Sequence, residues 1–554
     1  SNEDLGTAGS GTGTNEAGVG YATFSINLPT TSGTRAGSDP TFDKGDDDEY
    51  KVNDATLLIF KKVKETDKEG DYTFVESAEL GSMAPWKDPT EQGVTTHAKI
   101  TAKLEQVDKT DGYYALVLLN NGTGKNVKVT LPEKNAKFSD WNVDTNKDKE
   151  ATNKIANYDN GFYMANAPLF KDNNVTTLVA IDKDKIYPTE EQAAKSAATD
   201  VYVERGLAKV SLGTGTTTAK PVTSVTYQGD EVTISKWALD VTNKKAYPIH
   251  NVDGLTTEFP TIWSNDATTA STTNKATTQR FVDNNDKTSV KRVYWGKDPN
   301  YDNKDNDKTA LNAEFNYVAN ANVKEDPDKP LYCLENTFNL DNMKQGQTTR
   351  VVFKATYKPA SIAKGATFYK IGKNTAIWSE ADLEKEIKAA VASVVSGAAG
   401  KTTVTLNAPN NNITAAGTHY ITADNITVTD VTAETIEKAI TAINTQLGLK
   451  ETDKVGISTY AGGESYYIAR IKHFGDALTN WKSGTYGENN LEYLGRYGVL
   501  RNNWYVLTVQ SVSGPGYPSV PEVKPNTPDD EDDNYINVSV KILSWAKRSQ
   551  DVNL

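Results

Sequence analysis

The sequence predicts a mainly β protein with helical insertions and a separate strand near the C-terminus. Two observations support this class. Short runs in which β-branched and aromatic residues recur with a period of two are separated by stretches rich in Gly, Asn, Asp and Thr. The composition agrees, because 27 Tyr and only 3 Met are typical of sheets with one exposed face. The 554 residues suffice for about three or four domains.

The overall composition argues against several classes of function. A formal net charge of -13 disfavours nucleic-acid binding, which needs a basic surface. The single cysteine, Cys333, cannot form a disulfide within the chain. No apolar run reaches the roughly 18 residues of a membrane-spanning helix. Because the chain starts at Ser1 without Met and is Gly- and Thr-rich to Gly18, we expect the flexible leader of a trimmed, mature protein.

The first predicted strand covers residues 22–28. Its apolar side chains alternate with polar ones and fall on one face, namely Ala22, Phe24, Ile26 and Leu28. An exposed linker follows over residues 30–40, with Arg35 as its single basic residue, and the acidic residues 46–49 continue it. Proteases prefer such loops, so we expect an arginine-specific protease to cut between Arg35 and Ala36.

The first domain is predicted to span residues 36–212. Short apolar runs at 55–60 and 113–119 indicate buried strands, and further strands are expected at 175–181 and 201–212. Thr189 is the predicted N-cap of a short helix. The Gly- and Thr-rich residues 213–218 then mark the expected domain boundary.

The second domain is predicted to span residues 213–513. Strands are expected at 224–227, 232–239, 350–357, 466–471 and 505–510. Two helices interrupt them, one capped by Ser379 and the other starting near Thr432, each with an apolar stripe at helical spacing. A small β excursion is expected between these helices, and surface loops are expected at 264–308.

The C-terminal segment, residues 514–554, combines a tether with a strand. Residues 514–528 carry five prolines, and an acidic run follows at 529–533. Such a segment is stiff, extended and solvated. Beyond it, residues 535–545 alternate, with the apolar face made of Ile536, Val538, Val540 and Ile542. Either this strand closes the sheet of its own domain, or it adds to another subunit. The long tether favours addition.

Residues that could take part in catalysis or in ligand binding are scattered along the sequence. The histidines His97, His250, His419 and His473 lack metal-ligand spacing, and no nucleophile or phosphate-loop motif occurs. Asp-rich loops at 144–148 and 298–307 could ligate calcium, although a solvated loop is the simpler interpretation. Tryptophans could form a sugar platform, but are more often core or rim residues (Trp86, Trp141, Trp263, Trp295, Trp481). Cys333 lies in an apolar run and is interpreted as a buried hydrophobe. We therefore expect no enzyme, cofactor or metal.

Short segments spread along the chain match a known family. They are Thr34-Arg-Ala-Gly37, Val203-Glu-Arg with Ala208-Lys-Val, Cys333-Leu-Glu-Asn-Thr337, Val499-Leu-Arg-Asn-Asn503, and the tail Val538-x-Val-x-Ile-Leu-x-Trp545 with Val552-Asn-Leu554. By their order and spacing the chain resembles the type V fimbrillins of Bacteroidales, most of all their shaft subunits. It departs at Ser544, where the family has Pro, and at Asn553, where it has Asp.

The resemblance implies two transthyretin-like β-sandwich domains and a mode of assembly. Family members are exported as lipoprotein precursors to the outer membrane, with the lipid anchor confined to the precursor. An arginine-specific protease removes the first strand, and the C-terminal donor strand of a neighbouring copy fills the vacated groove. The resemblance thus implies a head-to-tail polymer at the cell surface. Its other partners would be anchor and tip subunits, and its roles would be adhesion and biofilm formation.

Two other functions stay open at this point. A tip or accessory fimbrial adhesin would need only one coupling device, whereas this sequence has both a removable strand and a donor strand. A secreted carbohydrate-binding β-sandwich protein would need no detachable first strand. A paired-carboxylate glycosidase has no support from composition.

Overall fold

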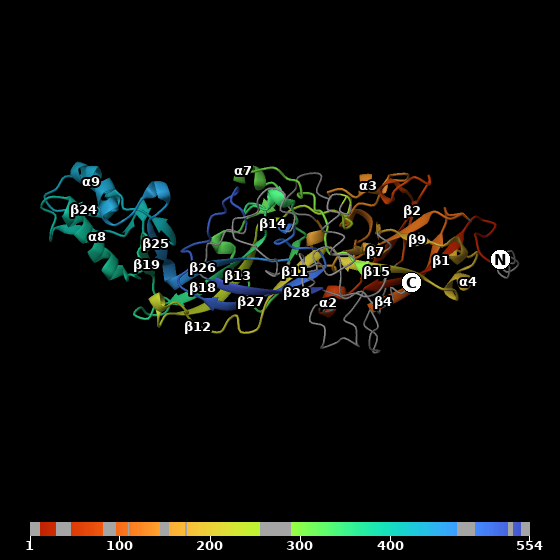
Figure 1. Cartoon of the computed structure of the whole chain (residues 1–554), viewed down its shortest axis with the longest axis horizontal. Coiled ribbons are helices and arrows are strands. Elements are labelled where there is room, and N and C mark those ends of the chain that lie inside the picture. Colours follow the sequence, from red (N-terminus) through yellow and green to blue (C-terminus); the bar gives the residue numbers. More distant parts are fainter. Residues whose placement is uncertain are drawn as a thin grey trace.

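The computed structural model describes residues 11–28, 46–80, 96–108, 110–144, 154–171, 174–254, 257, 290–473, 493–529 and 536–544. The mainly β class is confirmed, because strands dominate the order of elements and only two described helices exceed five residues. The molecule is elongated, with the first β domain toward one end and a small helical lobe at the other (Figure 1). Among the described helices, none has the length and apolar character to cross a membrane.

The first domain is built on an eight-stranded sheet in the order β3-β2-β5-β6-β10-β1-β4, with β9 paired to β5. The apolar runs predicted as buried strands form β2 and β5. Its edges approach each other, since the Glu76 carboxylate on β3 accepts hydrogen bonds from the N–H groups of Glu105 (2.8 Å) and Gln106 beyond β4. The sheet therefore curls around one core. Its strands are β1 Gly20–Leu28, β2 Ala55–Lys61, β3 Thr73–Glu79, β4 Thr96–Leu104, β5 Tyr113–Leu119, β6 Met164–Asn166, β9 Val179–Ile181 and β10 Thr199–Arg205.

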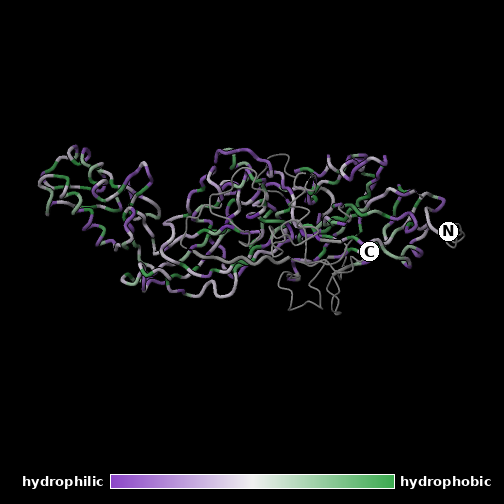
Figure 2. Tube along the Cα trace, in the orientation of Figure 1, coloured by the Kyte–Doolittle hydropathy of each residue, from purple (hydrophilic) through white to green (hydrophobic). Residues whose placement is uncertain are grey.

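The second domain packs two four-stranded sheets face to face. Their orders are β17-β11-β27-β28 and β12-β13-β18-β26. Tyr505 and Leu507 of the first sheet share one core with Phe353 and Tyr467 of the second, which makes this domain a β-sandwich. Figure 2 shows apolar residues along these strands and polar residues along the outer loops. The strands are β11 Leu207–Leu212, β12 Lys220–Pro221, β13 Glu231–Asp240, β17 Leu331–Leu334, β18 Arg350–Lys358, β26 Glu464–Arg470, β27 Asn503–Val512 and β28 Ile536–Ser544.

The helical lobe is an insertion with its own core. Both predicted helices are present, α8 (Glu380–Val394) and α9 (Ala433–Gln446); the predicted N-cap Ser379 is confirmed, and the second helix starts as expected, with Thr432 as its N-cap. Ser379 accepts a hydrogen bond from the N–H of Asp382 (3.2 Å), and Thr432 accepts one from Thr435 (3.3 Å). The predicted β excursion also forms. The lobe's strands are β19 Phe368–Ile371, β20 Thr402–Val404, β21 Asn407–Ala408, β22 Asn411–Asn412, β23 Gly417–His419, β24 Ile426–Val428 and β25 Ile457–Tyr460.

Short elements fill the remaining chain. The strand predicted at 175–181 is split in two at Thr177. Its N–H donates a hydrogen bond to the Glu69 carboxylate, and its carbonyl accepts one from the Asn166 side chain, so neither group pairs with a neighbouring strand. The strand predicted at 224–227 is a helical turn capped by Ser224. The other described helices and strands are α2 Asp47–Tyr50, α3 Phe138–Trp141, α4 Glu190–Ala194, α7 Lys308–Leu311, β7 Leu169–Lys171, β8 Asn174–Thr176, β14 Thr242–Asn243, β15 Val290–Arg292 and β16 Phe315–Asn316.

The chain passes between the two domains at Gly206. The sequence predicted one strand over 201–212 as the end of the first domain, but β10 stays in the first sheet while β11 pairs with β17 and β27 of the second. Gly206 allows the close crossing, because a Cβ there would lie 3.0 Å from both Ile155 and Tyr163. The predicted boundary after Leu212 is therefore six residues too late by this topology.

The proline-rich segment before the last strand is not a free tether. Tyr517 pairs through its backbone with Tyr466, and the carbonyl of Pro521 accepts a hydrogen bond from Arg350 (2.6 Å). Asp529, at the start of the predicted solvated run, is 0% exposed and accepts a hydrogen bond from Thr348 (2.8 Å). The expectation of a solvated arm is thus wrong for residues 514–529, since buried polar partners on the domain hold them in place.

Candidate functional site

β1 lies between two neighbours in the first domain's sheet. It pairs in parallel with β10, with Phe24 opposite Thr199 and Ile26 opposite Val201. It pairs antiparallel with β4 along its whole length, from Gly20 opposite Leu104 to Leu28 opposite Thr96. The strand predicted from the alternation of residues 22–28 is therefore an interior strand that satisfies backbone groups on both sides.

The inner face of β1 belongs to the core. Ala22, Phe24 and Ile26 are each 0% exposed and join the main apolar cluster of the domain. Their predicted orientation is confirmed, while the side chain of Leu28 lies outside the described residues. Removing this strand would uncover a slot with an apolar floor and two unpaired edges.

The outer face of β1 is covered as well, which the sequence pattern did not indicate. Thr23 is 3% exposed, and its hydroxyl lies 2.8 Å from the carbonyl oxygen of Ala193 in α4 and 2.8 Å from the hydroxyl of Thr101 on β4. Asn27, 8% exposed, donates to the Val201 carbonyl at 3.4 Å. The helix α4 thus closes the slot on the side expected to face solvent.

The predicted cleavage site lies outside the described residues. Arg35 and Ala36 fall between Leu28, the last described residue of β1, and Asp46. The described part of the chain therefore gives the two ends of this linker. Cleavage between Arg35 and Ala36 stays a prediction.

Directly after the linker, Glu49 is bound at the domain junction. Its carboxylate is 2.6 Å from the Lys209 ammonium on β11 and accepts a hydrogen bond from the Tyr332 hydroxyl on β17 at 3.0 Å. Its backbone carbonyl accepts from the Arg205 guanidinium on β10 at 2.5 Å. Burial lowers the pKa of Arg205 to about 10, so this group stays charged at neutral pH. Glu49 thus joins α2 to strands of both domains. The acidic run 46–49 was predicted as exposed linker, and for Glu49, 2% exposed, that prediction is wrong.

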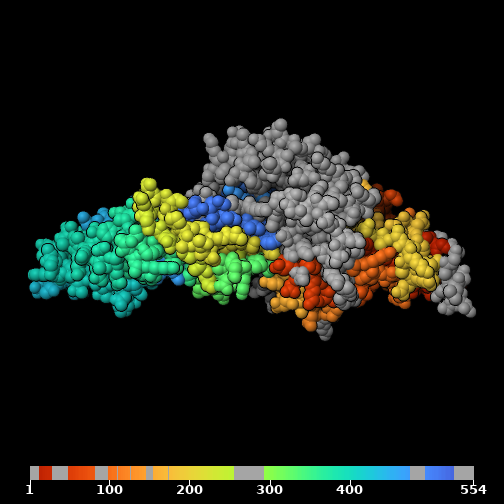
Figure 3. Space-filling model, turned by 90° about the horizontal axis from the view of Figure 1, so that it is seen from below, coloured from red at the N-terminus to blue at the C-terminus, as the bar shows by residue number. Residues whose placement is uncertain are grey.

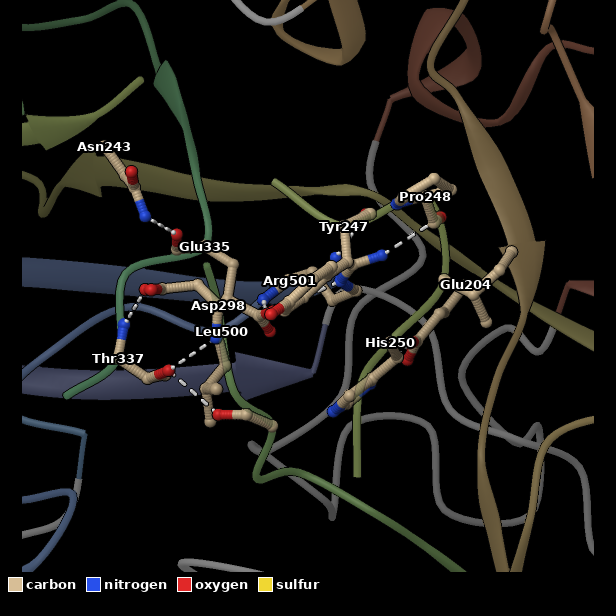
Figure 4. Close-up of polar contacts among 12 residues, drawn as sticks. Glu204, Asn243, Tyr247, Pro248, His250, Asp298, Glu335, Thr337, Leu500 and Arg501 are labelled. Atoms are coloured by element: carbon tan, nitrogen blue, oxygen red, sulfur yellow. Dashed lines mark hydrogen bonds and ion pairs between the residues drawn. The ribbon is translucent and has the colours of Figure 1, made fainter. Parts of the chain in front are cut away.

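A second buried polar cluster lies at the same junction (Figure 4). His250 contacts Glu204 at 2.7 Å through Nδ1 and the Trp295 carbonyl at 2.7 Å through Nε2. The Arg501 guanidinium is 3.5 Å from Glu335 and donates to the Tyr247 carbonyl at 3.0 Å. These contacts tie segments that lie far apart in the sequence to one another at the junction.

Three of the segments that carry the family resemblance meet at this junction. Arg205 of the first hydrogen-bonds through its N–H to the Asn502 side chain of the last at 3.1 Å. Asn336 of the middle segment forms a backbone bridge with Val499. Segments that lie far apart in the sequence are therefore in direct contact in the fold.

The other candidate residues form no common site. The Asp298 carboxylate accepts hydrogen bonds from the N–H groups of Thr337 (2.5 Å) and Asn300 (2.6 Å), and burial raises the pKa of this carboxyl. The calcium interpretation therefore lacks a free carboxylate at the start of 298–307. In the described ranges no group of three or more His, Cys, Asp or Glu is arranged to hold a metal ion. Burial also raises the pKa of Cys333 to about 12.

The remaining histidines and tryptophans have separate environments. His419 contacts the Ala415 carbonyl at 2.6 Å, and His473 contacts the Tyr505 hydroxyl at 2.9 Å. Trp141 donates to the Thr130 carbonyl at 2.7 Å, and Trp295 is 1% exposed in a core. Outside the residues whose side chains are described lie His97, Trp86, Trp263, Trp481 and, in the loop predicted at 144–148, residues 145–148.

The C-terminal strand pairs within its own chain. β28 runs antiparallel to β27, with Val540 opposite Leu507 and Val538 opposite Val509, and it forms the edge of its sheet. This is the first of the two arrangements that the sequence left open. In Figure 3 the blue C-terminal part of the chain lies as a strip along the yellow segment of the second domain. Residues 545–554 lie outside the described residues.

The fold and this site define a two-domain β protein with an interior first strand and a last strand at a sheet edge. Residues 458–551 match the family model described as major fimbrial subunit protein type IV, fimbrillin, C-terminal. This region of the chain is thus similar to the C-terminal region of fimbrial subunits, in agreement with the resemblance that the motifs indicate. No curated protein matches it significantly.

Several solved structures are distantly similar to this fold. A candidate cell adhesion protein from Parabacteroides distasonis has 10% identity and a TM-score of 0.35, with 95% of this chain and 97% of that chain covered. One from Bacteroides eggerthii has 12% identity and a TM-score of 0.34, covering 95% and 96%. The tip fimbrial protein Mfa3 from Porphyromonas gingivalis, truncated at its C-terminus, has 12% identity and a TM-score of 0.25, covering 95% and 100%.

Proposed function

We propose that this protein is the shaft subunit of a fimbria and that it polymerises by strand exchange after proteolysis. The observation that carries the proposal is the position of β1. It is an interior strand with three fully buried apolar side chains, and the chain leaves it through the Arg35 linker. Once that linker is cut, β1 is no longer covalently joined to the rest of the core, so another strand can replace it.

Energetics support replacement of β1 by the C-terminal strand of another copy. Burying Ile536, Val538, Val540 and Ile542 contributes roughly 6–12 kcal/mol before the cost of ordering. In its own chain β28 has one neighbouring strand, β27, whereas a strand in the slot has two, β10 and β4. A donor strand that moves from its own sheet into the slot would therefore replace one ladder of backbone hydrogen bonds with two.

Repetition of this step gives a filament. The donor strand belongs to the second domain of one copy and the slot to the first domain of the next, so the contact is head-to-tail and does not close. The partners are then other copies of this chain, an arginine-specific protease, and anchor and tip subunits at the ends. We place the fibre at the cell surface, after export of a lipoprotein precursor through the outer membrane, where it would support adhesion and biofilm formation.

The test is assembly of purified protein after treatment with an arginine-specific protease. Electron microscopy should show fibres, and gel filtration should show loss of the monomer. Arg35→Ala is the matched control, because it keeps the strand and the slot but removes the site of cutting. Cleaved protein that stays monomeric yet binds a ligand on a glycan array would favour an accessory adhesin or a carbohydrate-binding protein instead.

A further inference from the structure

We propose that the helical lobe binds a neutral saccharide, in a cavity where the end of β19 meets α8 and the end of α9. The cavity measures about 530 Å³ and opens to solvent. Pockets for small ligands span roughly 300–1,000 Å³, so its size suits a mono- or disaccharide. The inference is independent of strand exchange, because the lobe has its own core and lies at the end of the molecule opposite the first domain (Figure 1).

A close backbone approach forms one end of the cavity. Gly372 follows β19, and a Cβ there would lie 2.8 Å from the carbonyl oxygen of Gly448. Gly448 follows the C-cap of α9 and has a φ of 79°, the left-handed conformation in which many helices end. The ends of β19 and α9 therefore touch. The residues that flank these two glycines then line the cavity, namely Ile371, Lys373 and Leu447.

Trp378 supplies an aromatic side chain to the cavity wall. Its backbone N–H and carbonyl pair with those of Tyr369 on β19, both at 2.8 Å, and the next residue, Ser379, caps α8. The indole is thus held between a strand and the start of a helix, partly buried against the core of the lobe. Its Nε1 atom is a buried donor that has no hydrogen-bond partner among the described residues. A buried indole N–H usually has one, so this donor can serve a ligand oxygen when the edge of the ring turns toward the cavity.

Two side chains from the helices add polar groups that the fold does not use. Glu386 on α8 and Gln446, the last residue of α9, both line the cavity and are exposed. Within the described part of the chain, neither side chain forms a hydrogen bond or an ion pair. A carboxylate accepts hydrogen bonds, whereas a carboxamide both accepts and donates them. The wall therefore offers donors and acceptors together.

The charges around the cavity balance. Two lysines and two acidic residues line it, namely Lys373, Lys450, Glu386 and Asp453. Lys450 and Asp453 already form an ion pair of 3.1 Å. A phosphate or sulfate ester would be favoured by a net positive site, and a metal ion by a net negative one. An uncharged ligand with many hydroxyl groups fits better, because each hydroxyl both donates and accepts. A sugar ring also has apolar C–H groups that can pack against the indole.

The test is saturation-transfer NMR on uncut full-length protein with a panel of neutral, sialylated and sulfated oligosaccharides, of mammalian and of bacterial type. Calorimetric titration with the best-bound saccharide follows. We expect neutral saccharides to bind, and their type identifies the source of the ligand. Glu386→Ala should weaken binding about tenfold and Gln446→Ala about threefold, because hydrogen bonds to charged groups are the stronger ones.

Two further variants control for position and folding. Glu437→Ala, an exposed residue of α9 that does not line the cavity, should bind like wild type. Trp378→Ala should abolish binding. Because this tryptophan also packs on the core of the lobe, its result counts together with thermal unfolding and with Glu386→Ala, whose exposed side chain leaves that core intact.

Three results would overturn the site: no saccharide of the panel binds, only charged saccharides bind, or Glu386→Ala and Gln446→Ala bind as tightly as wild type. None of them depends on fibres. If the proposed function also holds, fibres of cut protein should bind the same saccharide more tightly than the monomer, because many lobes act together. Cut protein that forms no fibres, yet binds the saccharide through these residues, would remove the proposed function and support this site.

Discussion

Glu49 and Lys209 form an ion pair in which Oε1 and Nζ are 2.6 Å apart and the two side chains are 2% and 3% exposed. The pair joins the first residues after the linker to a strand of the second domain. Lys209 is further held over the ring of Trp504, 3.8 Å from its centroid. The part of the chain that follows the proposed cleavage point is therefore fixed at the domain junction independently of β1.

Removing one member of this pair should destabilise the uncut protein strongly. Glu49→Ala leaves the Lys209 ammonium buried without its carboxylate, which costs about 3–5 kcal/mol. Urea unfolding should show the loss. The double variant Glu49→Ala/Lys209→Met should recover much of it, because no uncompensated charge remains. If both variants are equally unstable, the contribution of Glu49 comes from its hydrogen bond to Tyr332 and not from the ion pair.

Limited digestion with an arginine-specific protease should cut first after Arg35. The described arginines other than Arg470 are at most 3% exposed, namely Arg205, Arg292, Arg350, Arg496 and Arg501. N-terminal sequencing of the large product should therefore give Ala36. Residues 1–35 should still co-elute at early times in native gel filtration, because Ala22, Phe24 and Ile26 are buried and β1 pairs on both sides. A first cut at Arg280, Arg470 or Arg548, or immediate loss of the fragment, would contradict this.

Substitutions in the last strand should distinguish the roles of its inner and outer faces. Val540 is the register partner of Leu507, which is 0% exposed, so Val540→Lys should lower the stability of the monomer as well as abolish fibres. Lys541→Ser, on the other face by strand alternation, should leave the monomer stable and allow fibres. Thermal unfolding and electron microscopy test both. A monomer unaffected by Val540→Lys would mean that pairing with β27 contributes little in solution.

Stability should depend on pH through Glu69. Burial raises the pKa of this carboxyl from 4.5 to about 7, against hydrogen bonds from the N–H groups of Thr177 and Leu178 that lower it. Because the folded state holds the proton more tightly than the unfolded chain, stability should fall as the pH rises from 4.5 to about 7. Glu69→Gln should remove this slope in chemical denaturation. An unchanged slope in the variant would assign the pH dependence to other groups.

Strong periodicity was sufficient to predict the elements it covers. The alternation around Phe24 and Leu507 and the apolar stripes of α8 and α9 each correspond to an element of the expected type. These patterns report which face is buried, which is a local property of the chain. They do not report which sheet a strand joins, so the break at Gly206 and the transfer of β11 to the second sheet were missed.

The polar contacts of the site could not be predicted for a related reason. Glu49 stands in an acidic run whose composition matches a solvated loop, and its partner Lys209 lies 160 residues away. Thr23 stands at an outward position of β1, and only the packing of α4 makes that position buried. The one available signal was that Glu204, Arg205, Glu335 and Arg501 occur in the segments that resemble the fimbrillins.

The crossing at Gly206 also has a mechanical consequence for a fibre pulled by moving fluid. β10 and β11 are separated by one residue, so tension enters the second domain directly from the strand that lines the slot of the first. The strands on either side of Gly206 are held by ladders whose hydrogen bonds lie across the chain direction. A pull along these strands must shear many of those bonds at once, so the subunit should resist stretching at the place where a flexible hinge would otherwise extend first.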